Sequence, residues 1–255
     1  MGVLFILTGT TKGLGEALAK QILTSASTEE RHLVTLSRKP TQELMDLAAK
    51  QSIKLTHLNV DLQDGAAVAK TAKQLSEIIA STPSDWKLRV IQNAGVVAPV
   101  LAASRLTELD AINAAFQINI TAPIVLNGHI LAAAQAMQDK RIMLISSGAG
   151  RSPTAGWGVY CATKAAMDRY VEVVALEQGE KVRITSMAPG IIDTAMQVQI
   201  RASDPADFPA IDRFKGFHEQ GQLGSAETIA SRLLTAFELA DYGSKPIDDI
   251  RQYTF

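Results

Sequence analysis

The feature that most constrains the fold is an alternation of short apolar runs with longer segments of helical spacing, repeated along the 255 residues. Six apolar runs lack the polar alternation of a half-exposed strand. They lie at residues 3–7, 32–37, 53–60, 88–95, 141–147 and 182–190. Strands of this composition are covered on both faces, and segments of helical spacing separate them along the chain. The sequence therefore predicts a doubly wound α/β sheet of parallel strands.

One segment departs from this alternation. Residues 195–224 are mostly polar, contain Pro205 and Pro209, and follow the sixth apolar run. A long insertion beyond the carboxyl end of a strand is well placed to cover a binding site. We therefore expect a single domain over residues 1–255, with a substrate lid at about residues 195–223.

Composition argues against several classes of partner. The formal net charge of −1 offers no electrostatic attraction to nucleic acid or to an anionic membrane. No apolar run approaches the roughly 20 residues of a membrane span, and the apolar N-terminus lacks the basic residues of a signal peptide. The single cysteine, Cys161, cannot form an internal disulfide, and the four histidines show no metal-ligand spacing. We expect a cytoplasmic protein that binds a small molecule and no metal, nucleic acid or membrane.

A glycine pattern connects the first apolar run to the first helical segment. Gly9, Gly13 and Gly15 are spaced G-x-x-x-G-x-G. Glycine permits a tight turn and a close approach of the backbone to a pyrophosphate, and the N-terminus of a helix offers free N–H groups. An ordinary turn can also use glycine. The position between a strand and a helix favours a dinucleotide site.

The end of the second apolar run bears on the choice between NAD(H) and NADP(H). In an NAD(H) site, a carboxylate about 20 residues after the glycines would bind the ribose hydroxyls. Ser37 holds this place here, and Arg38 and Lys39 follow it. Lys12 adds a further cation within the glycine loop. Basic side chains attract a 2′-phosphate, although they can also be ordinary surface cations. The pattern favours NADP(H).

The stretch "GWGVYCATKAAMD" (residues 156–168) places a phenol and an amine on a mostly apolar helix. Tyr160 and Lys164 are four residues apart and therefore share one helix face. Such pairs are often simply solvated. Here the pair follows the end of the fifth apolar run and a nucleotide loop upstream, which favours catalysis. Tyr160 is a candidate proton donor, and we expect the ammonium of Lys164 to lower its pKa.

Six motifs in this order resemble the short-chain dehydrogenase/reductase family across nearly the whole chain. They are TGTTKGLG (8–15), NAG (93–95), NITAP (119–123), ISSGAG (145–150), YCATK (160–164) and APGIIDT (188–194). The stretch around Tyr160 and the segment 188–201 are similar to the branch of sepiapterin reductases and of benzil reductases that form (S)-benzoin. The resemblance implies a Rossmann-type domain with helices on both faces of an about seven-stranded sheet in the order 3-2-1-4-5-6-7. It also implies hydride transfer between NADPH and a carbonyl group.

The resemblance assigns roles to individual residues. Ser147 matches the serine that orients the substrate carbonyl, and Asn119 matches the asparagine that holds a water in a proton relay to Lys164. Asn119 could instead cap or fill a helix kink. The residues implied for cofactor binding are Gly9, Thr11, Lys12, Gly13, Leu14, Gly15, Ser37, Arg38, Asp61, Leu62, Asn93, Ala94, Gly95, Tyr160, Lys164, Pro189, Gly190, Ile192 and Thr194. Among them, Asp61 is expected to meet the adenine, to cap the following helix, or to do both. The candidates for substrate contact are Ser147, Trp157, Tyr160 and Met196.

The resemblance leaves the substrate open in two places. Trp157 either lines a pocket for an aromatic substrate or packs the end of the sheet, and the aromatic residues of the lid have the same two alternatives. The sepiapterin branch holds its pterin with an aspartate near the C-terminus. Asp248 and Asp249 lie in the corresponding segment, and neither aligns with certainty.

The predicted function is reduction of one carbonyl of an α-diketone, such as benzil or the diketo side chain of sepiapterin, to an α-hydroxy ketone. One alternative is a reductase of the same fold for another ketone, such as an acyl thioester or a sugar. Another is an NADP(H) sensor without turnover, although the presence of the Tyr160–Lys164 pair counts against it. The region 100–138 and the helix from residue 159 are both long and apolar, and family members commonly pair these helices across a two-fold axis. We therefore expect a homodimer, with a tetramer as the alternative.

Overall fold

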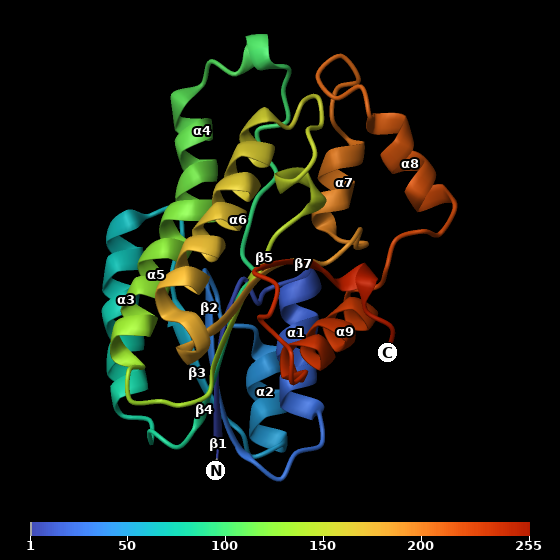
Figure 1. Cartoon of the computed structure of the whole chain (residues 1–255). Helices are drawn as coiled ribbons and strands as arrows, with labels where there is room; N and C mark the ends of the chain where they lie inside the picture. The colour runs from blue at the N-terminus through green and yellow to red at the C-terminus, as the bar shows by residue number, and fades with distance from the viewer. Residues whose placement is uncertain (1) are drawn as a thin grey trace.

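The computed structural model describes residues 2–255 of the chain. All strands lie in one sheet, every neighbouring pair is parallel, and the order is β3-β2-β1-β4-β5-β6-β7 (Figure 1). The predicted fold class and strand order are therefore confirmed. The strands are β1 (Gly2–Thr8), β2 (Glu30–Ser37), β3 (Lys54–Asn59), β4 (Lys87–Gln92), β5 (Lys140–Ile145), β6 (Arg183–Ala188) and β7 (Ile247–Asp249).

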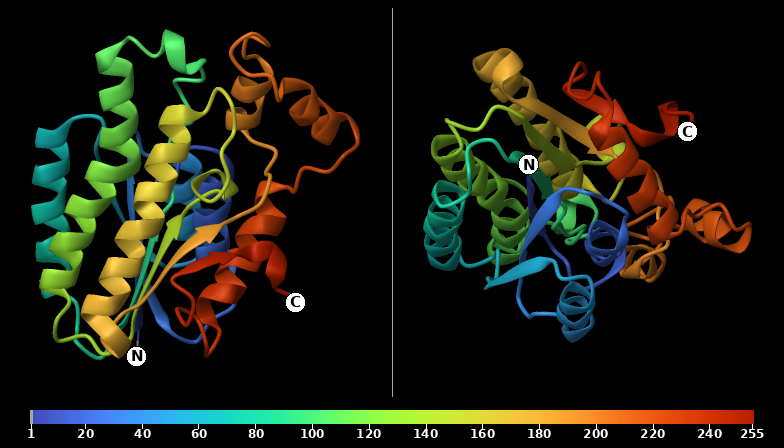
Figure 2. Two further views of the ribbon diagram at one scale, coloured as in Figure 1. Left: turned by 45° about the horizontal axis from the view of Figure 1, so that its top comes forward. Right: turned by 90° about the horizontal axis from the view of Figure 1, so that it is seen from below.

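Helices cover both faces of the sheet, which explains why its strands are apolar throughout (Figures 1 and 2). Along β1, Leu4 and Ile6 pack in one core with α3, α5 and α6, whereas Leu7 packs in a second core with α1, α2 and α9. The helices are α1 (Gly13–Thr24), α2 (Gln42–Lys50), α3 (Gly65–Ala80), α4 (Leu109–Phe116), α5 (Ala122–Ala133), α6 (Gly158–Gln178), α7 (Ala195–Arg201), α8 (Ile211–Glu219) and α9 (Ala226–Glu238). Short helical turns are η1 (Ala103–Arg105), η2 (Gln117–Thr121), η3 (Gly148–Gly150), η4 (Gly179–Lys181) and η5 (Ile250–Gln252).

The strand order reverses between β1 and β4. From β1 the chain first adds β2 and β3 on one side, and then returns to add β4 to β7 on the other. The loops after β1 and β4 therefore leave the sheet in opposite directions and open a crevice at their carboxyl ends. This crevice is where the predicted nucleotide loop and the predicted catalytic residues should meet.

A continuous helical stretch, Leu109–Ala133, runs through α4, the π-helical turn η2 and α5. By length and composition alone it could cross a membrane, which the sequence analysis did not foresee. This is weak evidence for a membrane span, because a core helix of a soluble protein can have the same length and composition. Leu126 and Ile130 do pack in the core, but Leu109 and Ile124 stay exposed.

The segment that was predicted to be a lid contains α7, α8 and the loop between them. The loop is anchored at its middle: the fully buried Phe208 stacks on Trp157 with ring centroids 5.2 Å apart. Next to it, the buried carboxylate of Asp207 accepts hydrogen bonds from the Ala102 backbone N–H at 3.0 Å and from Arg105 at 2.6 Å. The contacts of Asp207 and Phe208 therefore attach the segment to the rest of the domain. α7 precedes this attachment in the chain and α8 follows it.

Candidate active site

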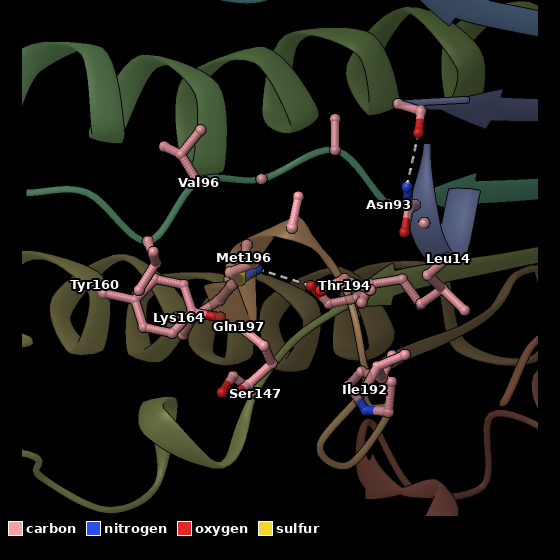
Figure 3. A pocket seen from close by; sticks show the side chains of 18 of the residues that line it. Leu14, Asn93, Val96, Ser147, Tyr160, Lys164, Ile192, Thr194, Met196 and Gln197 are labelled. Atoms are coloured by element: carbon pink, nitrogen blue, oxygen red, sulfur yellow. Dashed lines mark hydrogen bonds between the residues drawn. The ribbon is translucent and has the colours of Figure 1, made fainter. Parts of the chain in front are cut away.

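One cavity of about 660 Å³ occupies the crevice at the carboxyl edge of the sheet. Every residue predicted to bind cofactor or substrate lines it, as do Tyr160, Lys164 and Ser147. Asn119 alone among the predicted residues does not line it, since its side chain is buried. Figure 3 shows the cavity with Leu14 and Asn93 toward one end and Tyr160 toward the other.

The glycine loop has the geometry that a phosphate site requires. Gly9 and Gly13 have φ angles of +75° and +59°, in the left-handed region that favours glycine. A Cβ atom at Gly15 would lie 2.1 Å from the carbonyl oxygen of Gly9, so a side chain there would push the loop apart. Lys12 is the N-cap residue of α1, and its side chain does not bind the helix N-terminus. The first N–H groups of α1 therefore carry no side-chain cap and are available to an anion.

The loop after β4 is attached to the glycine loop. The Asn93 amide nitrogen donates to the carbonyl oxygens of Thr8 and Gly9 at 3.1 and 3.2 Å. Thr8 in turn accepts a hydrogen bond from the Ala94 backbone N–H at 3.0 Å. This explains why the asparagine of the NAG motif belongs to the site: it fixes the carbonyl side of the glycine turn.

Two cations border the cavity where a ribose phosphate would be read. Ser37 is buried at the end of β2, and Arg38 and Lys12 are exposed in the cavity lining. Within residues 2–255, neither Arg38 nor Lys12 pairs with a carboxylate. Lys39, which follows Arg38, does not line the cavity. Two unpaired cations and the lack of a carboxylate at Ser37 suit a phosphate group better than ribose hydroxyls.

The expectation that Asp61 caps the following helix is wrong. The N-cap of α3 is Asp64, whose carboxylate accepts hydrogen bonds from the N–H groups of Ala66 and Ala67. Asp61 instead accepts a hydrogen bond from the Gln63 backbone N–H at 3.0 Å and lines the cavity. The helix begins one turn later than a cap at Asp61 would require, so this carboxylate remains at the edge of the site.

Tyr160 and Lys164 lie on the same face of α6 and both are buried. The Lys164 ammonium lies 5.8 Å from the Tyr160 ring centroid and donates a hydrogen bond to the Ile145 carbonyl oxygen at 2.8 Å. Burial lowers the pKa of Lys164 to about 8, and the nearby Asp168 carboxylate opposes this fall.

The expectation that Lys164 lowers the pKa of Tyr160 is wrong for this structure. Burial raises the pKa of Tyr160 to about 12, with the Ser147 side chain acting in the opposite direction. Burial is the largest cause of this rise in the pKa of Tyr160, and the Lys164 ammonium donates its hydrogen bond to the Ile145 carbonyl at the end of β5. A phenol with so high a pKa keeps its proton at neutral pH, which is the form that a proton donor needs.

The two serines after β5 face different partners, as their alternation along a strand predicts. Ser147 lines the cavity and accepts a hydrogen bond from the Ala149 backbone N–H at 3.2 Å, which starts the turn η3. The Ser146 hydroxyl donates to the buried carboxylate of Asp168 at 2.7 Å. Ser147 is therefore the hydroxyl available to a ligand.

Asn119 occupies the π-helical turn η2, and its side chain is fully occupied by the protein. Its amide oxygen accepts from the Val96 N–H at 2.9 Å, and its amide nitrogen donates to the Val96 carbonyl and the Thr163 hydroxyl at 2.9 and 3.0 Å. A Cβ atom at Gly95 would lie 3.3 Å from this amide and 3.6 Å from the Lys164 ammonium. The side chain thus fills the helix distortion, as the alternative interpretation held, while lying near Lys164. Its proposed part in a proton relay stays a prediction.

An aromatic cluster closes the far end of the cavity. The Trp157 ring meets Tyr160 edge-on at 5.4 Å between centroids, and Phe214 lies 5.2 Å from Trp157. Phe208 and Ile200 complete this buried cluster, and Met196 packs against it. Trp157 both lines the cavity and packs in the cluster, so the pocket-lining role and the packing role that were offered as alternatives are compatible. Phe208 is outside the cavity lining and serves packing alone.

The C-terminal aspartates do not line the cavity. The Asp248 carboxylate accepts a hydrogen bond from the Tyr253 hydroxyl at 2.5 Å. The two carboxylate oxygens of Asp249 accept hydrogen bonds from Nε and Nη2 of Arg251 at 2.9 and 2.6 Å, and Arg251 lines the cavity. A cationic side chain therefore stands where an aspartate was considered.

Three functional candidates were missed by the sequence analysis. Gln197 and Arg251 line the cavity, but no spacing in the sequence marks them. Asp168 was detectable, because it follows Lys164 by four residues and so extends the polar face of α6 by one turn.

Comparison with known proteins agrees with this geometry. A family model described as "short chain dehydrogenase" matches residues 4–205. A benzil reductase ((S)-benzoin forming) from Bacillus cereus is 37% identical and covers 93% of this chain and 94% of its own length. A sepiapterin reductase from Rattus norvegicus is 29% identical, and the match covers 91% of this chain and 90% of that protein. A solved structure of a short chain dehydrogenase from Burkholderia cenocepacia in complex with NADP has a TM-score of 0.70 at 22% identity. The match covers 96% of this chain and 94% of that chain.

A parallel sheet with a glycine loop at its switch point and a buried tyrosine–lysine pair defines a dinucleotide-binding oxidoreductase. The chain belongs to the short-chain dehydrogenase family.

The cavity fits a nicotinamide dinucleotide by its own features. The space beside Gly15 and Gly9 admits no side chain, and the start of α1 is free of side-chain caps, so a pyrophosphate would find backbone donors there. Arg38 follows the end of β2 and Lys12 lies in the glycine loop, both without a carboxylate partner among residues 2–255, while Thr194 lies against Gly13 and Lys164 lines the cavity beside Tyr160. The donor set therefore suits the dinucleotide from its phosphates to its nicotinamide.

Proposed function

We propose that this protein is an NADP(H)-dependent carbonyl reductase that converts one carbonyl of an α-diketone to an alcohol, giving an α-hydroxy ketone. The observation that carries the proposal is the meeting of Ser147, Tyr160 and Lys164 in one cavity with the glycine loop and the unpaired Arg38. The cofactor is NADP(H), which Arg38 after β2 and Lys12 in the glycine loop favour and which a structural neighbour holds. When bound, NADPH supplies the hydride.

The chain's own residues hold the carbonyl and deliver its proton. Ser147 and Tyr160 both present hydroxyl groups to the cavity, and a carbonyl oxygen can accept from both. The phenol of Tyr160 keeps its proton through the neutral range because its pKa is raised to about 12. Lys164, as an ammonium, donates to the Ile145 carbonyl and can donate to a ribose hydroxyl as well. Two hydroxyl donors on one carbonyl oxygen stabilise the charge that develops as hydride arrives.

The aromatic end of the cavity supports an aryl-substituted substrate. Trp157, Phe214 and Phe217 line it beyond Tyr160, so a ring attached to the reacting carbonyl would be covered by apolar surface. The relative from Bacillus cereus is a benzil reductase, which is consistent with such a pocket. The C-terminal Arg251 does not resemble a pterin-binding aspartate, so benzil-like diketones fit better than a pterin.

The test is NADPH oxidation by the purified protein with benzil, sepiapterin, a simple aryl ketone, an acyl thioester and a keto sugar. The same series with NADH measures the cofactor preference. We expect the highest kcat/KM with benzil and NADPH. Faster reduction of the thioester or the sugar would replace the substrate class, and tight NADPH binding without turnover of any carbonyl would point to a sensor.

The assembly that we propose is a homodimer through the outer faces of α4, α5 and α6. Large apolar side chains are exposed on these neighbouring helices: Leu109, Phe116, Ile124, Val173 and Leu176. A second copy related by a two-fold axis would cover them. Sedimentation of the wild type and of Leu176→Glu would test this, with a dimer expected only for the wild type. The cytoplasmic location stays a prediction.

A further inference from the structure

Beneath the catalytic face of α6 lies a buried carboxylate that the reaction itself does not use. Asp168 follows Lys164 by one helical turn and is only 4% exposed. It accepts hydrogen bonds from the Ser146 hydroxyl at 2.7 Å and the Ser186 hydroxyl at 2.5 Å, and from the Arg151 guanidinium at 3.2 Å. These partners come from the ends of β5 and β6 and from the loop after η3. One carboxylate therefore fastens α6 to two strand ends and a loop.

Three consecutive residues at the end of β5 make three different contacts. The Ile145 carbonyl accepts from Lys164, the Ser146 hydroxyl donates to Asp168, and Ser147 lines the cavity. The turn that follows packs directly on α6, because a Cβ atom at Gly150 would lie 2.9 Å from the Lys164 carbonyl oxygen and 3.0 Å from the Asp168 carboxylate. Any shift of Asp168 would therefore move Ser147 relative to Lys164.

The carboxylate also sets the charge around Lys164. The other groups that face the lysine are Tyr160 on the same helix, the neutral amide of Asn119 and the Ile145 carbonyl. Asp168 supplies the negative charge among them, and Arg151 partly neutralises it from the far side. In a buried setting an opposite charge strongly favours the ionised form of its neighbour.

We propose that Asp168 is a positioning residue that keeps Lys164 charged and holds the Ser147 turn against α6. The inference rests on the proposed reductase function only for its kinetic readout. As an ammonium, Lys164 has three N–H donors, so it can donate to the Ile145 carbonyl and the cofactor ribose with charge-assisted hydrogen bonds. Asp168 and Arg151 then act on it with opposite signs.

The test compares two charge variants with one neutral variant. Asp168→Asn removes the negative charge while keeping the shape, and we expect the Lys164 pKa to fall by about one unit. The basic limb of the kcat–pH profile for benzil reduction should then move to lower pH, so that kcat falls about tenfold above that limb and little at lower pH. Arg151→Gln removes the opposing cation and should move the limb upward. Ser186→Ala keeps both charges and should leave the limb in place.

A second readout does not depend on catalysis. Titration of Lys164 by 15N NMR of labelled lysines, assigned with Lys164→Met, measures its pKa in each variant. A fall in Asp168→Asn with a rise in Arg151→Gln supports the inference. An unchanged pKa, a shift of the same sign in both, or a pH-independent loss of kcat in Asp168→Asn would overturn it. If no carbonyl is reduced, the proposed function fails, and the NMR titration still decides the role of Asp168.

Discussion

The two ends of the active-site crevice are built by different means. The cofactor end, around Gly9, Gly13 and Gly15, is shaped by the backbone, with two positive φ angles and a turn too tight for a side chain. The substrate end is shaped by side chains, since Trp157 from the start of α6 meets Phe208 and Phe214 from the 195–223 segment. The first depends mainly on backbone conformation and the second on the packing of side chains.

This difference implies that the two ends can be changed independently. The glycine loop is joined to β2 by the hydrogen bond from the Gly9 N–H to the Leu36 carbonyl, and to the loop after β4 by the Asn93 amide. The aromatic cluster is joined to the body through Phe208 and the Asp207 contacts. Variants at one end should therefore alter its ligand and leave the other ligand's affinity unchanged.

The largest effect is expected where the two ends meet. Tyr160→Phe removes the proposed proton donor but keeps the ring against Trp157, and should lower kcat by about 10²–10⁴-fold. NADPH affinity, measured by fluorescence titration, should change little. Tyr170→Phe, on the same helix outside the cavity, is the matched control and should keep full activity. Equal kcat in Tyr160→Phe and wild type would contradict the assignment of the proton donor.

The next effect concerns the substrate end. Phe208 is fully buried, so Phe208→Ala should lower the free energy of unfolding by about 3–5 kcal/mol and raise KM for benzil as the 195–223 segment loses its contact with Trp157. The affinity for NADPH should be unchanged in the folded protein. Phe255→Ala, at an exposed position near the C-terminus, serves as the control in chemical denaturation. A matching loss of NADPH affinity would show that the two ends are coupled.

A smaller effect is expected at the cofactor end. Arg38→Glu should weaken NADPH binding by about tenfold or more, because a charge-assisted hydrogen bond to a phosphate is replaced by repulsion. NADH binding and KM for benzil should change much less. Lys39→Glu alters the neighbouring cation outside the cavity and should have the weaker effect. Equal losses for NADPH and NADH would mean that Arg38 does not contact a 2′-phosphate.

The same contrast explains what could be predicted from the sequence. The sheet order and the glycine loop follow from local patterns, because apolar strands and glycine turns are encoded where they occur. The high pKa of Tyr160 could not be predicted, since it depends on burial by residues from the 195–223 segment and on where the Lys164 amine points. Helix boundaries also shifted the role of Asp61, because Asp64 competes for the same cap. Arg251 reaches the cavity only through the pairing of β6 with β7.

The smallest expected effect is on the acid stability of the outer strands β2 and β3. His32 on β2 is buried and bonded to the Thr56 hydroxyl on β3 at 2.9 Å, and burial, with the charge of Lys54, lowers its pKa to about 4. A histidine with a folded pKa below its unfolded value stabilises the fold above about pH 6.5, and this stability is lost as the pH falls toward 4. His32→Gln can keep a hydrogen bond to Thr56 without titrating. Between pH 7 and about pH 4.5, urea denaturation should show that the wild type loses about 1–2 kcal/mol more stability than His32→Gln. Equal losses would place the acid sensitivity elsewhere in the chain.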